Sequence, residues 1–290
     1  MQSSIPAAQI LPDGRFVSFA QNGEDAVLLR VFRDQPEGFW IDIGANHPVR
    51  DSVTKNFSTL GWSGINVEPV ASLHEELVRD RPTDINILAG VSDHSGSMVF
   101  HRNDSNLDLS TFRDELADHY RGLGHDIVDI DVPVLTLREI CDEHAAGRTI
   151  DFLKIDAEGH ELAVLEGHDF DRYPPRVVLV EFGIHEAPIE DFLLGVGMRT
   201  VLFDGVNQWF VRDGEDDDFV RQLSRPPVAV LDGYHPHIYL VLLAQKEDWI
   251  QAQHGRIAEL EEECARLRSG ATVDGTTRRR LSPSWLPWRR

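Results

Sequence analysis

The sequence is poor in cysteine and contains no long apolar run. Its two cysteines, Cys141 and Cys264, lie far apart, lack the paired spacing of a zinc or redox motif and cannot form a disulfide framework. No run of about 18 apolar residues would span a bilayer, and the first residues lack the basic and apolar segments of a secretory signal. We therefore expect a protein of the reducing cytoplasm.

Basic residues are also scarce. The sequence has 28 Lys and Arg against 49 Asp and Glu, a net charge of −21, whereas nucleic-acid binding needs a surface rich in Lys and Arg. We therefore exclude nucleic acid as a partner, and a neutral sugar remains compatible. Residues 276–290 differ, because they hold five arginines and no acid. With Trp285 and Trp288, they predict a disordered tail that makes weak contact with an anionic membrane surface.

The length of 290 residues, 41% of them hydrophobic, suits one large domain with a buried core. Short apolar strands alternate with helical stretches, which predicts an α/β fold with a Rossmann-like, doubly wound and mostly parallel sheet and a C-terminal helix. The expected strands are Phe39–Ile43, Gly64–Glu68, Ile85–Gly90, Ile127–Leu135, Ile150–Ile155 and Arg176–Glu181, with an antiparallel pair at Val201–Phe203 and Gln208–Arg212. The expected helices are Asp51–Leu60, Ala71–Asp80 and Leu137–Ala145, the last capped by Thr136.

The pattern divides the chain into four parts. Residues 1–37 form a helical segment on the acceptor side, residues 38–245 the main domain, residues 246–269 a helix and residues 270–290 the basic tail. Polar residues 102–126 interrupt the strands and predict a mobile insertion over the site. Apolar residues between 250 and 267 fall at heptad positions a and d, so this helix either docks on its own domain or pairs with a second copy. We expect a homodimer.

A cofactor site is expected where the first two strands end, because a wound sheet binds its ligand at the carboxyl ends of its strands. The small residues of the Asp42–Asn46 turn allow the backbone to approach a ligand closely. Glu68 comes 24 residues after Gly44, the spacing of a carboxylate that binds ribose hydroxyls, and Pro69 fixes its direction. Asn46 and Pro48 stand in the stretch where the dinucleotide fingerprint has its next two glycines, which disfavours a nicotinamide cofactor.

Three further segments carry polar residues at strand ends. Ser92 and Asp93 follow the third strand, where Asp93 either bonds an adenine amino group or forms a simple turn. Lys154, Asp156 and Glu181 stand at the ends of apolar strands, where charges are costly unless paired or used. They form either a structural network or a catalytic centre in which Asp156 and Glu181 hold Mg²⁺.

Four motifs together resemble the FkbM family of methyltransferases that depend on S-adenosylmethionine (SAM). They are Gln21-Asn22-Gly23-Glu24-Asp25, Asp42-Ile43-Gly44-Ala45-Asn46, Val67-Glu68-Pro69 and Lys154-Ile155-Asp156-Ala157-Glu158-Gly159-His160-Glu161, in family order. Pro48 departs from the family, which commonly has glycine there. The resemblance implies a Rossmann-like fold of the class I methyltransferase type, SAM as donor and transfer to oxygen. It also implies that Asp42, Gly44 and Asn46 approach the methionine part, Glu68 the ribose and Asp93 the adenine.

We therefore predict an O-methyltransferase that acts on a hydroxyl of a small glycan or glycosylated metabolite. Because the acceptor must lose a proton, we assign His160 as general base, with Asp156 and Lys154 beside it and Mg²⁺ as a second means of acidifying the hydroxyl. A helix-surface histidine is the alternative for His160. Residues 225–242 form either an acceptor wall or, at Ile238–Leu243, a buried edge strand. The rival functions are a nicotinamide-dependent oxidoreductase and a non-catalytic scaffold that assembles through residues 249–268.

Overall fold

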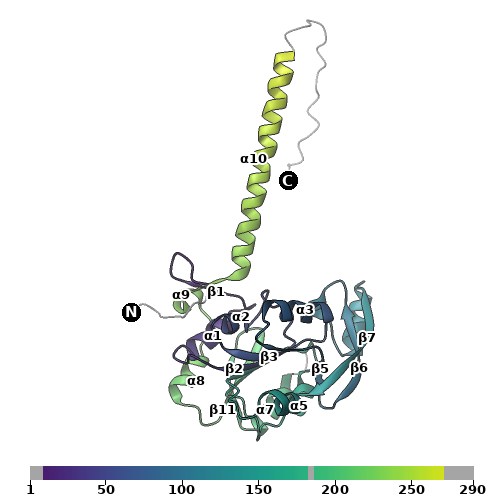
Figure 1. Cartoon of the computed structure of the whole chain (residues 1–290), viewed down its shortest axis with the longest axis vertical. Coiled ribbons are helices and arrows are strands. Elements are labelled where there is room, and N and C mark those ends of the chain that lie inside the picture. The colour runs from purple at the N-terminus through teal and green to yellow at the C-terminus, as the bar shows by residue number, and fades with distance from the viewer. Residues whose placement is uncertain (1–8, 182–185, 271–290) are drawn as a thin grey trace. The chain divides into compact units, whose positions relative to one another are not determined.

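The computed structural model describes residues 9–181 and 186–270 (Figure 1). The chain divides into two units, residues 1–239 and 240–290, and each is described by itself. The predicted disordered tail, with Trp285 and Trp288, lies outside the described residues, apart from its first residue, Gly270. Within the described residues, no helix is long and apolar enough to cross a membrane.

A seven-stranded sheet forms the centre of the first unit and confirms the predicted fold class. Its strand order is β10-β11-β9-β8-β2-β3-β4, and five neighbouring strands run parallel while β11 runs antiparallel to both of its neighbours. The chain winds outward from β2 in one direction and from β8 in the other, so the switch point lies between these two strands. The bounds are β2 (Phe39–Ile43), β3 (Ser63–Val67), β4 (Ile85–Ile87), β8 (Phe152–Ile155), β9 (Val177–Glu181), β10 (Met198–Phe203) and β11 (Asn207–Arg212).

Helices cover both faces of this sheet because its strands are apolar on both sides. Ile41 packs in one buried cluster and its neighbour Trp40 in the other, as alternate strand residues point to opposite faces. The Ile41 face is covered by α5 (Leu137–His144), α6 (Glu161–Glu166) and α7 (Glu186–Gly195). The Trp40 face is covered by α1 (Glu24–Val31), α2 (Lys55–Thr59) and α8 (Asp217–Leu223). The first turn of α5 has the predicted Thr136 cap, which forms a capping box with Glu139.

Three strands that follow β4 in the chain form a second sheet, separate from the central one. Its order is β5-β7-β6, with bounds β5 (Gly90–Ser92), β6 (Gly96–Asn103) and β7 (Ile127–Thr136). The single strand expected over Ile85–Gly90 is therefore wrong, because β4 ends at Ile87 and β5 pairs with β7 instead. Residues 102–126 are also more regular than expected: they hold the end of β6, the 3-10 helix η1 (Leu107–Leu109) and α4 (Asp114–Gly122). The remaining helix of the wound sheet is α3 (Ala71–Asp80), as predicted.

The chain leaves the first unit through a short strand and a long helix. Along the chain, α9 (Ala229–Asp232) is followed by the strand β12 (Tyr234–Pro236) and then by α10 (His237–Gly270). β12 pairs in parallel with β1 (Phe16–Ser18), which lies near the N-terminus of the described chain. The edge strand expected at Ile238–Leu243 is wrong, because these residues belong to α10. Their apolar side chains recur at helical spacing, which a short run does not distinguish from a buried strand. The predicted C-terminal helix is confirmed as α10, which begins at His237.

Candidate active site

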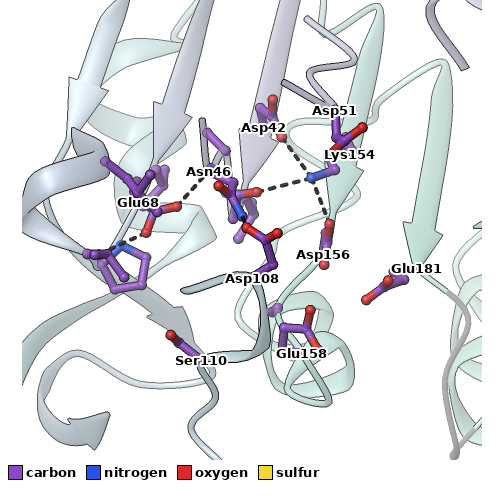
Figure 2. A pocket seen from close by; sticks show the side chains of 18 of the residues that line it. Asp42, Asn46, Asp51, Glu68, Asp108, Ser110, Lys154, Asp156, Glu158 and Glu181 are labelled. Atoms are coloured by element: carbon purple, nitrogen blue, oxygen red, sulfur yellow. Dashed lines mark hydrogen bonds and ion pairs between the residues drawn. The ribbon is translucent and has the colours of Figure 1, made fainter. Parts of the chain in front are cut away.

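A pocket opens at the carboxyl ends of β2, β3, β8 and β9, next to the switch point (Figure 2). Its wall contains Gln21 and Glu24 from the N-terminal motif and Asp108 and Phe112 from the 102–126 segment. Most of the residues predicted from the sequence also line it: Asp42, Gly44, Asn46, Glu68, Pro69, Lys154, Asp156 and Glu181. The topology thus brings together motifs that are far apart in the chain.

The turn after β2 requires glycine at position 44. Gly44 has a φ of +71°, and a Cβ atom there would lie 1.8 Å from the backbone oxygen of Asp156. Two further contacts fix the turn: the Lys154 ammonium donates to the Gly44 carbonyl at 3.0 Å, and the buried Arg81 guanidinium donates to the Pro48 carbonyl. The path of the chain at Pro48, where the sequence departs from the family motif, is therefore held by Arg81.

Glu68 is 4% exposed and is oriented by two backbone amides. Its Oε2 accepts from the N–H of Asn46 and its Oε1 from the N–H of Val70, both at 2.8 Å. Burial raises the pKa of Glu68 to about 7. Each carboxylate oxygen has a second lone pair, so the group retains the capacity to accept two hydroxyl donors, as a ribose diol requires.

An apolar wall adjoins Glu68. Val70 follows Glu68 by two residues, and the Glu68 N–H donates to Ile87, two residues before Ala89. The wall consists of Val70, Leu73, Ala89, Val91, Phe100 and Phe112. A flat aromatic base fits such a surface, because it buries apolar area while its ribose reaches the carboxylate.

Ser92, Asp93 and His160 do not line the pocket. The Ser92 hydroxyl lies 3.0 Å from His160 Nε2 and 3.1 Å from an Asp93 oxygen, so the three side chains form one network. The His160 ring lies against Phe112, which is a pocket residue, with ring centroids 5.2 Å apart. Burial lowers the pKa of His160. The role of His160 as general base and that of Asp93 in adenine binding stay predictions.

Lys154 is the centre of an ion network (Figure 2). Its Nζ lies 3.1 Å from Asp156 Oδ2 and 3.5 Å from Asp42 Oδ1, and it is almost fully buried. Burial lowers the pKa of Lys154, but the carboxylates of Asp156 and Asp42 outweigh it, and the net pKa is raised. Asp42 is itself buried and accepts from the Thr54 hydroxyl at 2.9 Å. Lys154 therefore remains charged and holds the ends of β2 and β8 together.

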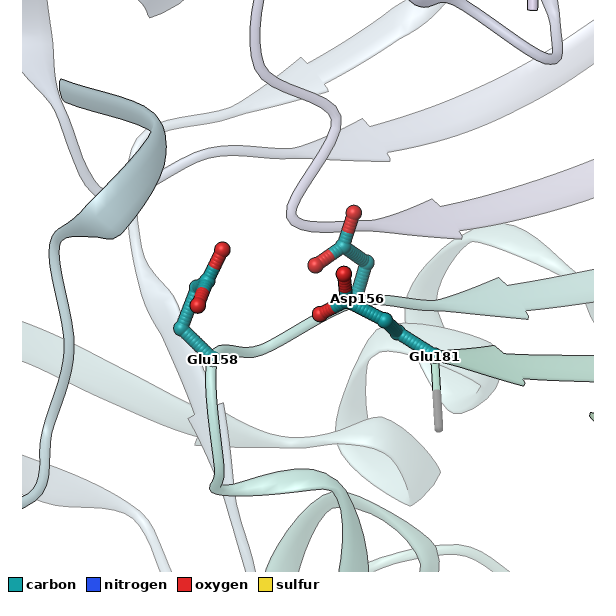
Figure 3. Close-up of side chains that lie close together, drawn as sticks. All are labelled: Asp156, Glu158 and Glu181. Carbon is teal, nitrogen blue, oxygen red and sulfur yellow. The ribbon is translucent and has the colours of Figure 1, made fainter. Parts of the chain in front are cut away.

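Three carboxylates gather beside this network (Figure 3). Oxygen atoms of Asp156, Glu158 and Glu181 all lie within 4.8 Å of one another. Burial, followed by the charge of Asp156, raises the pKa of Glu158 to about 8 and also raises that of Glu181. Glu161 shapes the turn that presents Glu158, because its Oε1 accepts from the N–H groups of Ala157 and Gly159.

Sequence reasoning missed several residues of this pocket, and three of them lie within motifs that it had recognised. Glu158, at a φ of +49°, is the middle acid of the Lys154–Glu161 motif, which was the available signal. Gln21 and Glu24 belong to the N-terminal motif, and Glu24 Oε1 accepts from the Asn207 side chain at 2.8 Å. That contact brings α1 to β11 and makes the N-terminal motif part of the wall.

The sheet order and a pocket at the switch point define a Rossmann-like α/β protein whose pocket lies where such sheets bind their ligands. Residues 42–221 match the methyltransferase FkbM domain, and the chain belongs to this family of SAM-dependent methyltransferases. Among solved structures, it is similar to a TehB-like SAM-dependent methyltransferase from Corynebacterium glutamicum, with 10% identity over 65% of this chain and 88% of the other and a TM-score of 0.36. No curated protein matches the chain.

The pocket residues fit the cofactor that the family implies. Gly44 leaves room for close backbone approach, Glu68 offers two acceptor oxygens to a ribose, and the apolar wall offers a surface to adenine. SAM supplies an electrophilic methyl group on a sulfonium. The family match favours methyl transfer over the nicotinamide-dependent alternative.

Proposed function

We propose that the chain transfers a methyl group from SAM to a hydroxyl oxygen of a small glycan or glycosylated metabolite. The observation that carries this proposal is the carboxylate cluster of Asp156, Glu158 and Glu181 in the same pocket as Glu68. In Figure 2, Glu68 and Glu181 lie on opposite sides of the pocket, with Asn46 and Asp108 between them. A cofactor with its ribose at Glu68 therefore has a separate polar region in front of it for an acceptor.

Methyl transfer to a hydroxyl requires a group that accepts the hydroxyl proton. The sulfur–carbon bond breaks as the oxygen–carbon bond forms, and the hydroxyl proton has to leave the acceptor. Alignment of the reacting atoms provides most of the rate, and a general base adds about 10²–10⁴-fold. Glu158 and Glu181 suit this role because a raised pKa makes the ionised carboxylate a stronger base than an ordinary one, and the pKa of about 8 for Glu158 lies close to neutral pH.

Magnesium is part of the proposal. Three carboxylates offer the oxygen donors that Mg²⁺ prefers. Lys154 compensates part of the charge of Asp156 at 3.1 Å, while burial and then the charge of Asp156 raise the pKa values of Glu158 and Glu181. A cation held there would supply positive charge that acidifies the acceptor hydroxyl.

A sugar hydroxyl suits this site better than an amine. A cluster of carboxylates favours the protonated form of an amine, which has no lone pair to attack the methyl group. The wall near the cluster also carries neutral polar side chains, Gln21, Ser110 and Asn207, that can bond several hydroxyls. The net charge of −21 further disfavours polyanionic acceptors.

The test is an acceptor screen with SAM over neutral oligosaccharides and glycosides, with mass spectrometry and NMR locating the methyl group. We expect an O-methyl ether. Glu158→Gln and Glu181→Gln should lower kcat by about 10²-fold or more with the affinity for S-adenosylhomocysteine retained. Glu166→Gln, on the exposed side of α6, is the matched control and should leave kcat unchanged. Methyl transfer to nitrogen, or to no hydroxyl in the screen, would contradict the proposal.

Two additions to the assay separate the parts of the mechanism. EDTA should lower the rate, and added Mg²⁺ should restore it. Full activity in EDTA would contradict the proposed role of Mg²⁺, and the carboxylates would then accept the proton without a metal. His160→Ala tests the base predicted from the sequence. Because His160 does not line the pocket, we expect a smaller loss of kcat than for Glu158→Gln.

A further inference from the structure

Apolar residues recur along helix α10 at a spacing that places them in a stripe on one side of the helix. A heptad frame places Leu243, Ile250, Ile257 and Cys264 at position a and Lys246, Gln253, Leu260 and Leu267 at position d. Ile257, Leu260 and Leu267 are 52%, 44% and 68% exposed. Large apolar side chains at this spacing are costly to leave in water, and the stripe has the period of a coiled-coil seam.

We propose that α10 pairs with α10 of a second copy of this chain as a parallel, in-register, two-stranded coiled coil over residues 243–267. The side-chain types favour two strands, because Ile250 and Ile257 at a with Leu260 and Leu267 at d are the combination preferred by dimers. The stripe spans about three and a half heptads, which is sufficient for a coiled coil. Lys246 and Gln253, the polar d residues, weaken the N-terminal half, because the pairing places each of them opposite the same residue of the second copy.

Charge complementarity indicates a second copy in parallel orientation. In such a pair, each g residue faces the e residue five positions further along the partner helix. Arg256 at g then faces Glu261 at e, while the pairs Trp249 with His254 and Leu242 with Glu247 bring no like charges together. Arg256 is bonded to Glu259 of its own helix at 2.9 Å in an exposed ion pair, which is weak enough to exchange.

A disulfide between two Cys264 residues would detect this arrangement. It is exposed and stands at position a, so a parallel in-register pair places the two Cys264 residues opposite each other. A disulfide needs Cα atoms about 4.4–6.8 Å apart, a separation that facing seam residues meet. Cys141 is buried, which raises the pKa of its thiol to about 12 and keeps it unreactive.

Light scattering of the full chain, under reducing conditions and over a wide range of concentration, tests the dimer. We expect a mass twice the 32.8 kDa of one chain. Ile257→Asp should produce a monomer because it buries a charge in the seam, whereas Ala258→Asp at the outer b position adds the same charge and should leave the dimer intact. A monomeric wild type, or an Ile257→Asp variant that remains dimeric, would overturn the proposal.

Mild oxidation with diamide tests the parallel register. On a non-reducing gel, the wild type should run as a covalent dimer and Cys264→Ser as a monomer. Arg256→Glu should weaken the dimer, and the added change Glu261→Arg should restore it. A dimer that forms no Cys264 crosslink, or that is indifferent to both charge changes, would show that the helices do not pair in this way.

Discussion

Gly44 links the geometry of the backbone to the shape of the pocket. The residue directly follows β2 and lies against the backbone of Asp156, which directly follows β8, and its positive φ turns the chain toward Asn46. The Asn46 N–H then reaches Glu68, which ties this turn to the end of β3. A single residue without a side chain therefore allows three strand ends to meet around one pocket.

Gly44→Ala is expected to unfold more easily and to lose affinity for S-adenosylhomocysteine. The positive φ alone costs about 1 kcal/mol for alanine, and the Cβ would also collide with the Asp156 backbone oxygen. Gly61→Ala is the matched control, since Gly61 has a φ of +85° with nothing within 4 Å of an added Cβ. Urea denaturation and calorimetric titration of both variants measure the difference. Equal stability and affinity in the two variants would contradict this account of the turn.

Glu24 makes the stability of the fold depend on pH. Burial raises its pKa from 4.5 to about 7, so the folded chain binds this proton more tightly than the unfolded chain. Between pH 4.5 and 7 the folded state holds more protons, and the free energy of unfolding therefore falls as pH rises through this window, by up to about 3 kcal/mol, and levels off above it.

Urea denaturation across this pH window, on wild type and Glu24→Gln, checks the effect. The variant cannot titrate at this position and should lose part of the slope. Other acids whose pKa values are raised by burial, among them Asp25, Glu68 and Glu158, keep the rest. Glu37→Gln, at an exposed site, is the control. An unchanged slope in Glu24→Gln would show that this proton is not held in the folded state.

At the scale of elements, the strands of the central sheet were predictable because their residues are apolar on both faces and polar residues follow directly. The division between β4 and β5 was not, since Leu88 and Ala89 continue the apolar run without a turn residue. The start of α10 was missed because apolar residues 238–243 suit a buried strand and a helix equally. Local pattern gave no information on which sheet β5 joins, because β7 lies more than 30 residues away in the chain.

Hydrogen bonds and an ion pair connect the 102–126 segment to the turn after β2. Asp108 accepts two bonds from the Arg50 guanidinium, at 2.7 and 2.8 Å, and one from the Asn46 side chain at 3.0 Å. These bonds lower the pKa of Asp108. Because Asp108 and Phe112 line the pocket, the contact positions this part of the wall over the cofactor region.

Asp108→Asn should weaken binding of S-adenosylhomocysteine several-fold, because it removes the bidentate ion pair with Arg50 while keeping a side chain of the same size. Asp51→Asn is a matched control: Asp51 lies 3.3 Å from the same guanidinium and its φ of +57° suits asparagine. Calorimetric titration compares the two. Equal losses in both variants would show that the net charge near Arg50, and not the contact between the segments, affects binding.

At the scale of the whole molecule, much of the candidate site could be predicted because its residues follow strands of one parallel sheet. Asp42, Glu68 and Lys154 meet for this reason. Ser92 and Asp93 did not join them, because β5 leaves the central sheet and its end faces a different neighbour. Glu158 was missed because its position depends on a turn with positive φ, which spacing in the sequence does not reveal.

The central claim is that the pocket binds the nucleoside part of SAM through Glu68. Calorimetric titration with S-adenosylhomocysteine, on wild type, Glu68→Ala and the exposed control Glu75→Ala, tests it most directly. We predict binding to wild type and control and loss of binding in Glu68→Ala, with all three proteins folded by circular dichroism. Absence of binding in the wild type, or full affinity in Glu68→Ala, would contradict the account.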